Sequence, residues 1–171
     1  FGQTETCVML FNNEWINPKP GAMGMPSAGW NIQLLDERGR QISESNTVGE
    51  ICVFIKDKKP TGLFQGYHKN EKQTASANRD GYYHTGDMAY RDNDGYYWFV
   101  GRNDDMIKTS GYRVSPFEVE SVLIEHPSVR EVAVTGIPDK SRGMAVKATI
   151  VLNKYFQPTD ALVRQIQDHV K

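Results

Sequence analysis

The sequence has little of several features that mark particular classes of protein. Only 2 of its 171 residues are cysteine, and Cys7 and Cys52 lack the paired spacing of a zinc site or a disulfide framework. We therefore expect two ordinary, partly buried thiols and a reducing compartment. No apolar run approaches the roughly 18 residues of a membrane-spanning helix, so we expect no membrane span.

An excess of one sign of charge is also missing. Lys and Arg total 20 while Asp and Glu total 21, so the net charge is -1. Such a chain lacks the broad basic field that non-specific nucleic-acid binding needs, and we expect no nucleic-acid partner. The 39% of hydrophobic and 24% of charged residues favour a globular protein with a packed core over a disordered chain.

Strand and turn patterns dominate the first hundred residues. Runs rich in β-branched and aromatic residues predict strands at 32–36, 50–55, 81–85 and 95–100. The sequence Asp-Asn-Asp-Gly at the start of the last run is a strong hairpin-turn signal. A short helix is expected at 71–78. The strand spacing predicts a small antiparallel β-unit, either a barrel or a sandwich.

Helical patterns enter in the remainder of the chain. Ser115 as N-cap and Pro116 at the first helical position predict a helix, which Pro127 ends. Strands are expected at 129–137 and 145–152, followed by a final helix that begins after Thr159. The fold class is therefore α+β.

The chain divides at a polar junction. We expect a small antiparallel β-barrel-like subdomain at 1–100, a hinge at 101–105 and a small α+β domain at 106–171. A plain surface turn explains the composition of the junction equally well. Because the chain has no initiator Met and the last helix has no element after it to cover it, we expect a piece of a longer protein, partnered by the remainder of that chain.

Three polar clusters carry groups suited to chemistry. In the first, Glu5 could hold a phosphate-bound Mg²⁺ and Thr4 could donate to a phosphate oxygen. In the second, Asp87 follows a glycine turn and could accept hydrogen bonds from a ribose diol. In the third, arginines at 102 and 113 could bind phosphate or ribose oxygens, and Gly111 could let a slender ligand approach the backbone.

Each cluster also has a purely structural explanation. The first could be a polar strand end, the second an Asx-turn and the third a salt-bridged surface turn. His84 is more simply a packed or exposed histidine than a catalytic base. The sequence shows no Gly-x-Ser-x-Gly elbow and no His/Cys/Asp grouping that suggests a metal site.

Together, the order and spacing of these clusters resemble the adenylate-forming superfamily of acyl-CoA synthetases, peptide-synthetase adenylation domains and firefly-type luciferases. The matching segments are Phe-Gly-x-Thr-Glu at 1–5, Gly-Glu-Ile at 49–51, Gly-Tyr at 66–67, Thr-Gly-Asp at 85–87 and the long stretch at 101–120. The likeness is closest to medium-chain acyl-CoA synthetases, relatives of acetyl-CoA synthetase. It covers essentially the whole chain.

The resemblance implies particular roles in the first half of the chain. Phe1 would stack on adenine, and Gly2 and Gln3 would belong to the same nucleotide-binding segment. Thr4 would contact the α-phosphate or the substrate carboxylate, and Glu5 would ligate Mg²⁺. The ribose would be held by Asp87 and Arg102.

The resemblance also assigns roles around the junction. Asp104 would be the hinge residue, which changes its backbone angles when the C-terminal domain rotates. Lys108 would lie on the face presented after rotation, and Arg113 would face the nucleotide phosphate or the second-step site. Gly111 would line the pantetheine tunnel. Ser110 and Tyr112 are weaker candidates for contact with coenzyme A.

The implied reaction is the activation of a carboxylic acid by ATP to an acyl-adenylate, followed by transfer of the acyl group to coenzyme A. The cofactors would be ATP/AMP, Mg²⁺ and coenzyme A, and the location cytoplasmic or, in a eukaryote, the mitochondrial matrix. Gly2 stands where a Trp shortens the acyl pocket of acetyl-specific relatives, so we expect an acid longer than acetate. The chain alone should be inactive, because the family's phosphate loop and one catalytic Lys are absent. Alternatives are an adenylation domain that loads a carrier-protein thiol and a non-catalytic nucleotide-binding module.

Overall fold

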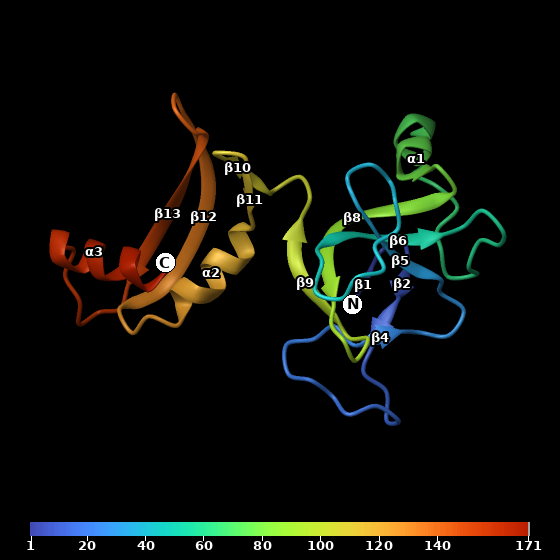
Figure 1. The fold of residues 1–171 in the computed structure, drawn as a ribbon, viewed down its shortest axis with the longest axis horizontal. Coiled ribbons are helices and arrows are strands. Elements are labelled where there is room, and N and C mark those ends of the chain that lie inside the picture. The colour runs from blue at the N-terminus through green and yellow to red at the C-terminus, as the bar shows by residue number, and fades with distance from the viewer. Residues whose placement is uncertain (171) are drawn as a thin grey trace. The chain divides into compact units, whose positions relative to one another are not determined.

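The structure is a computed structural model that describes residues 1–170 and divides into two compact units (Figure 1). The first unit comprises Phe1–Asn103 and the second begins at Asp104. Each unit has its own hydrophobic core. No helix among residues 1–170 is long and apolar enough to cross a membrane.

A five-stranded antiparallel sheet organises the first unit. Its order is β5-β6-β8-β7, and β9 also pairs with β8, with bounds β5 Ile32–Leu35, β6 Gly49–Phe54, β7 Asn78–Arg79, β8 Tyr82–Arg91 and β9 Tyr97–Arg102. The pairing found among residues 1–170 leaves this sheet open rather than closing it into a barrel. The expected antiparallel α+β class is confirmed.

The central strand β6 explains why this sheet is stable. Ile51, Cys52 and Val53 are all fully buried, so β6 is covered on both faces. A short continuous apolar run is typical of such a strand. The core around it contains Met9, Leu10, Ile32, Leu34, Leu63, Tyr83, Ala89 and Tyr97.

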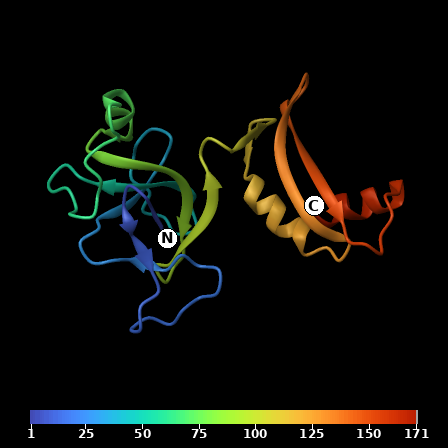
Figure 2. The same cartoon turned by 180° about the vertical axis from the view of Figure 1, so that it is seen from behind.

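Smaller elements complete the first unit, which Figure 2 shows from behind. Two short hairpins pair β1 (Gly2–Gln3) with β2 (Cys7–Val8), and β3 (Leu10–Phe11) with β4 (Met25–Pro26). Helix α1 spans Glu71–Ala77, close to the expected range. The hairpins were not predicted, because strands of two residues are too short to show an alternating pattern.

The second unit is a four-stranded antiparallel sheet with two helices. The sheet order is β11-β10-β13-β12, and the bounds are β10 Ile107–Thr109, β11 Tyr112–Val114, α2 Pro116–Ile124, β12 Val129–Asp139, β13 Gly143–Leu152 and α3 Asp160–His169. Its core is formed by Ile107, Leu123, Val129, Val134, Leu162 and Ile166. The expected helix, strand, strand, helix order is present, preceded by a hairpin that the sequence did not reveal.

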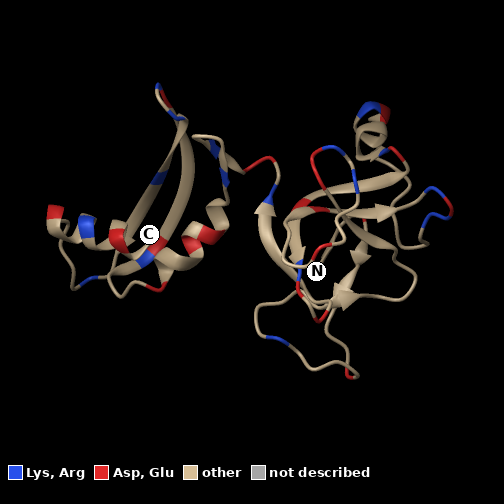
Figure 3. Cartoon of the chain, viewed as in Figure 1, with Lys and Arg blue, Asp and Glu red and all other residues tan. Residues whose placement is uncertain are grey.

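The polar junction has more regular structure than its composition suggested. Gly101 and Arg102 are the last two residues of β9, so the proposed hinge at 101–105 begins inside a strand. Gly101 is buried, whereas the next three polar residues after Arg102 are exposed. Figure 3 shows both acidic and basic residues in each unit, in keeping with the small net charge.

Candidate functional site

Gln3 joins the N-terminal hairpin to β8. Its Nε2 donates to the Thr85 carbonyl oxygen at 2.9 Å and to Asp87 Oδ2 at 2.5 Å. Its Oε1 accepts from the Tyr83 hydroxyl at 2.8 Å. The amide thus contacts three residues of β8, two through their side chains and Thr85 through its backbone carbonyl oxygen.

Asp87 is a buried carboxylate held from both sides. Arg102 lies directly across from it in the β8–β9 register, and its NH1 lies 3.4 Å from Asp87 Oδ1. Arg102 also donates to the Thr85 carbonyl oxygen at 3.0 Å. A buried charge is tolerated where it is paired and hydrogen-bonded, so the pairing with Arg102 and Gln3 fixes the orientation of this carboxylate.

Gly86 is required between these residues. Its φ of +75° is disfavoured for L side chains, and a Cβ there would lie 2.8 Å from Arg102 NH2. The Gly86 amide donates to Glu50 Oε1 at 3.0 Å. The Thr-Gly-Asp segment lies within β8 rather than in the turn expected from the sequence, and the β8–β9 pairing places Asp87 opposite Arg102.

Glu5 and Thr4 lie in the turn between β1 and β2. Thr4 is exposed, while Glu5 is half-buried and accepts a 2.8 Å hydrogen bond from the Tyr67 hydroxyl through Oε1. Burial raises the pKa of Tyr67, and the neighbouring Glu5 carboxylate raises it further. Tyr67 thus remains a neutral donor, and the bond uses only one oxygen of the Glu5 carboxylate.

Phe1 and Gly2 lie at the start of the same hairpin. The Phe1 ring is half-buried and lies 6.4 Å from the Phe99 ring, between centroids. A Cβ at Gly2 would lie 1.8 Å from the Cys7 carbonyl oxygen. This backbone conformation therefore requires glycine at position 2, because any side chain would clash with the Cys7 backbone.

In the second unit, the remaining candidate residues share one hairpin. Lys108 and Arg113 are cross-strand partners in the β10–β11 register, and both are exposed. Ser110 (φ +48°) and Gly111 (φ +83°) form the two-residue turn between them, with Tyr112 following. Two positive φ values are typical of the type I′ turn that suits a tight hairpin. The hairpin thus presents two cations on one face.

Tyr112 and Asp104 are both at the surface. Tyr112 is 74% exposed. Asp104 is exposed in the turn between β9 and β10. The structure thus gathers Gln3, Asp87 and Arg102 in the first unit, and Lys108 and Arg113 in the second.

Reasoning from the sequence missed Tyr67 and Tyr83. Tyr67 belongs to the Gly-Tyr segment, yet nothing in that pair signals a contact with Glu5. Tyr83 contacts Gln3 across 80 residues of sequence. Burial raises the pKa of Tyr83 well above its usual range, and the carboxylate of Glu5 adds to the effect. Tyr83 therefore stays a hydrogen-bond donor at any physiological pH.

The structure brings together three side chains of metal-ligating type that the sequence spacing does not indicate. Glu50, Cys52 and His84 offer donor atoms that all lie within 4.8 Å of one another. The sequence hides this cluster because β6 and β8 are far apart along the chain and meet only through pairing. Cys52 is also fully buried rather than partly so, and this burial raises the pKa of its thiol.

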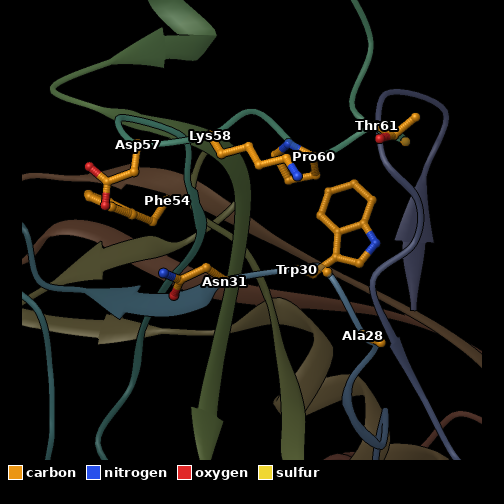
Figure 4. Close-up of a pocket in the computed structure, with 10 residues that line it drawn as sticks. Ala28, Trp30, Asn31, Phe54, Asp57, Lys58, Pro60 and Thr61 are labelled. Carbon is orange, nitrogen blue, oxygen red and sulfur yellow. The ribbon is translucent and has the colours of Figure 1, made fainter.

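A separate cavity lies on the first unit, away from these residues. Its volume is about 410 Å³, and Trp30, Phe54 and Lys58 are among the residues that line it. Figure 4 shows the Trp30 indole beside it, with Asn31 and the Lys58 side chain nearby. None of the residues expected to bind nucleotide lines this cavity.

Comparison with known proteins shows what this chain is similar to. Residues 118–171 match the AMP-binding enzyme C-terminal domain. Over its whole length the chain is 50% identical to 4-hydroxybutyrate--CoA ligase 1 of Metallosphaera sedula and 49% identical to the mitochondrial acyl-coenzyme A synthetase ACSM3 of Rattus norvegicus. The relatives named here are therefore CoA ligases and acyl-CoA synthetases. The chain spans 30% of the length of each of these two relatives.

Solved structures of adenylate-forming enzymes share the fold. ATP-bound MatB from Rhodopseudomonas palustris is 33% identical, with a TM-score of 0.85 over 98% of this chain and 32% of that one. The o-succinylbenzoate CoA synthetase MenE from Bacillus subtilis, in complex with its acyl-adenylate intermediate, is 32% identical, with a TM-score of 0.74 over 88% of this chain and 29% of that one. The α+β arrangement found here is therefore that of adenylate-forming enzymes.

Proposed function

We propose that this chain is part of an ATP-dependent, AMP-forming acyl-CoA synthetase. The enzyme would convert a carboxylic acid to an acyl-adenylate and then transfer the acyl group to coenzyme A. The observation that carries the proposal is the buried Asp87 carboxylate held by Gln3 and Arg102, in a chain about half identical to two named CoA ligases.

The first unit would bind the nucleotide. Asp87 would accept hydrogen bonds from the ribose hydroxyls, and Arg102 would donate hydrogen bonds to the ribose oxygens. Both side chains are held in place before the ligand arrives. Gln3 would keep Asp87 oriented, and Phe1 would supply an aromatic face for adenine. Thr4, exposed in the turn, would donate to the α-phosphate or to the acid's carboxylate.

Glu5 fits a role as a Mg²⁺ ligand. Mg²⁺ prefers hard oxygen donors, and in nucleotide sites it takes one or two carboxylates together with substrate phosphates. The bond from Tyr67 orients the carboxylate through one oxygen and leaves the other for the ion. When bound, Mg²⁺ would neutralise charge that develops on the phosphates as pyrophosphate leaves.

The second unit would serve the thioester-forming step. Lys108 and Arg113, paired across the β10–β11 hairpin, would provide positive charge for phosphate groups. Gly111, at which no atom lies within 4 Å of a Cβ position, would leave room for the slender pantetheine arm. Ser110 and Tyr112 would contact coenzyme A beside it. A change in backbone angles at Asp104 would bring this face into use.

The substrate we propose is a carboxylic acid longer than acetate. The proposal rests on glycine at position 2 and is supported by a relative named for 4-hydroxybutyrate. Gly2 is also required by the fold of its hairpin, so a bulky substitution there would disturb the nucleotide segment as well as the pocket. Chain length is therefore best tested with graded acids on the unaltered enzyme. We place the enzyme in the cytoplasm or the mitochondrial matrix, the latter supported by the relatives named mitochondrial.

The deciding experiment uses the full-length protein that contains this sequence. With ATP and acids of graded length, we expect release of AMP and pyrophosphate, with acyl transfer to coenzyme A and not to a phosphopantetheinylated carrier protein. Asp87→Asn should lower kcat/KM for ATP by roughly 10–100-fold, because a hydrogen bond to a charged group is worth about 1.5–3 kcal/mol. Asp57→Asn makes the same chemical change at an exposed residue and should leave kcat/KM for ATP unchanged.

Three results would contradict the proposal. They are the absence of AMP formation with any acid, transfer to the carrier protein in preference to coenzyme A, and an Asp87→Asn variant that folds normally and retains its kcat/KM. The 171-residue chain alone is expected to show no ATP–pyrophosphate exchange, so exchange by that chain would overturn our assignment of essential groups to other segments.

A further inference from the structure

On one face of the first unit's sheet, three side chains of types that can ligate a metal lie close together, and the proposed reaction uses none of them. Cys52 in β6 and His84 in β8 are direct partners in the strand register. Glu50 lies two residues before Cys52, so its side chain is on the same face of β6. The Cys52 side chain is fully buried, while those of His84 and Glu50 are 9% and 14% exposed.

The contacts in this cluster converge on one atom. His84 Nδ1 lies 2.9 Å from Glu50 Oε2, 3.4 Å from Cys52 Sγ and 3.0 Å from the NH2 of Arg79. A neutral imidazole nitrogen either donates or accepts. If Nδ1 carries the proton, its N–H faces the N–H donor of Arg79. If Nδ1 is unprotonated, its lone pair faces the lone pairs of the Glu50 carboxylate. Neither tautomer satisfies both neighbours.

The other ring nitrogen indicates which atom of His84 would bind a cation. His84 Nε2 is buried and has no hydrogen-bond partner among residues 1–170, whereas the contacts with Glu50, Cys52 and Arg79 are all made by Nδ1. With the single proton of the neutral imidazole on Nε2, the lone pair of Nδ1 is available to a cation.

The spacing suits a tetrahedral zinc-type ion. With bond lengths of about 2.3 Å to sulfur, about 2.05 Å to nitrogen and about 2.1 Å to oxygen, tetrahedral angles require about 3.6 Å between S and N and about 3.4 Å between N and O. The observed Sγ to Nδ1 distance of 3.4 Å is close to this value, and the Nδ1 to Oε2 distance of 2.9 Å must widen by roughly half an ångström.

We propose that Glu50, Cys52 and His84 form a binding site for a zinc-type divalent transition-metal ion, and that the Arg79 guanidinium occupies the cation position in the metal-free protein. Thiolate, imidazole and carboxylate together are the donors that zinc prefers. Glu50 is held for this role because its other oxygen accepts from the Gly86 amide. Binding breaks the S–H bond of Cys52, and its proton leaves to solvent while sulfur donates its electron pair to the metal. The proposal is independent of the synthetase activity.

Titration of the purified, metal-free 171-residue chain with Co²⁺ and Zn²⁺ tests the site directly. We expect one equivalent of Co²⁺ to bind with a thiolate-to-metal charge-transfer band, which Zn²⁺ removes by competition. Cys52→Ala should abolish the band and Glu50→Gln should weaken binding by at least about tenfold. Cys7→Ala should change neither the band nor the affinity, because Cys7 is exposed and lies in β2, outside the cluster.

Arg79→Ala separates metal binding from a purely structural cluster. Arg79 is 47% exposed, so the variant should fold, and loss of the competing cation should tighten Co²⁺ binding. Arg38→Ala, at an exposed turn, is the matched control and should bind as the unaltered chain does. The proposal is overturned if neither the unaltered chain nor Arg79→Ala binds Co²⁺, if the band survives in Cys52→Ala, or if Arg79→Ala leaves the affinity unchanged.

Discussion

Single residues in this protein act through contacts that span most of the first unit. Gln3 holds Asp87 across 84 residues of sequence, and Tyr83 in turn holds Gln3. The Glu50 carboxyl shows the balance of forces at such positions. Burial raises its pKa, but hydrogen bonds from His84 and the Gly86 amide and the charge of Arg79 outweigh burial, so the net shift is downward. Glu50 therefore stays ionised at neutral pH.

Asp92 is the residue for which the structure gives a definite acid dependence. It lies in the turn between β8 and β9, where its carboxylate accepts from Lys19 Nζ at 2.6 Å and Trp98 Nε1 at 3.0 Å. Burial opposes ionisation, but these bonds and those from the backbone amides of Tyr96 and Asp94 lower its pKa from 3.8 to about 2. A carboxyl whose pKa is lower in the folded state than in the unfolded state stabilises the protein at pH values above its unfolded-state pKa. This stability is lost as the pH falls through the folded-state pKa.

Asp92→Asn should therefore reduce the free energy of unfolding at pH 7 and also reduce its loss on acidification between about pH 4 and about pH 2. Urea unfolding at a series of pH values measures both. Asp94→Asn is the matched control, because it removes only the more exposed contact of Lys19 and should keep most of the acid dependence. An equal pH slope in Asp92→Asn and the unaltered chain would contradict the assignment.

Individual elements are defined by their ends as much as by their apolar faces. Helix α2 begins at Ser115, whose Oγ accepts from the Glu118 amide at 3.2 Å, and Pro116 occupies the first helical position. Helix α3 has the same arrangement, with Thr159 Oγ1 accepting from the Leu162 amide at 3.2 Å. These caps satisfy amides that the helix itself leaves without partners.

Ser115→Ala should destabilise α2 by about 0.5–2 kcal/mol, because the hydroxyl that caps the helix is lost. Amide hydrogen exchange in the first turn of α2 is the suitable measurement, since it reports on this element alone. Ser121→Ala makes the same change within the helix, where the hydroxyl donates to the Phe117 carbonyl oxygen, and should have little effect. Equal exchange rates in Ser115→Ala and Ser121→Ala would show that the cap is not what holds the first turn.

At the scale of the whole molecule, the chain has two units with separate cores and one short connection. The boundary falls between Asn103 and Asp104, at the end of β9. Asn103 is still tied to the first unit, because its amide donates to the Gly86 carbonyl oxygen at 2.8 Å. Asp104 is thus the first residue past that bond.

If Asp104 is the hinge, its substitution should separate the two half-reactions of the full-length enzyme. Asp104→Pro fixes φ near −65° and removes the amide hydrogen. We expect ATP–pyrophosphate exchange to persist and thioester formation to be lost, as measured by separate assays of the two steps. Asp104→Ala keeps the backbone free and should retain both activities. Loss of both steps in Asp104→Pro, or of neither, would contradict a hinge at this residue.

Much of the fold and part of the candidate site follow from local patterns. Strands β5 and β6, helix α1 and the caps of α2 and α3 were predictable, because each depends on a pattern of residues that are close together in the sequence. The two-residue strands and the β10–β11 hairpin were not, because strands of two or three residues are too short to show a periodic pattern. The candidate site residues were proposed through motif resemblance, whereas the contacts of Tyr67 with Glu5 and of Tyr83 with Gln3 are not evident in any motif.

The sequence by itself determined the α+β class, the positions of the longer elements and the order of the three polar clusters, since periodicity, caps and glycine turns act over a few residues. Only the tertiary structure decided which side chains meet. The Asp87–Arg102 pair and the Glu50–Cys52–His84 cluster depend on strand register between distant segments, and Gln3 reaches β8 from a separate hairpin. Register is set by packing of the whole sheet, and a shift of one residue in a strand would turn its side chains to the opposite face.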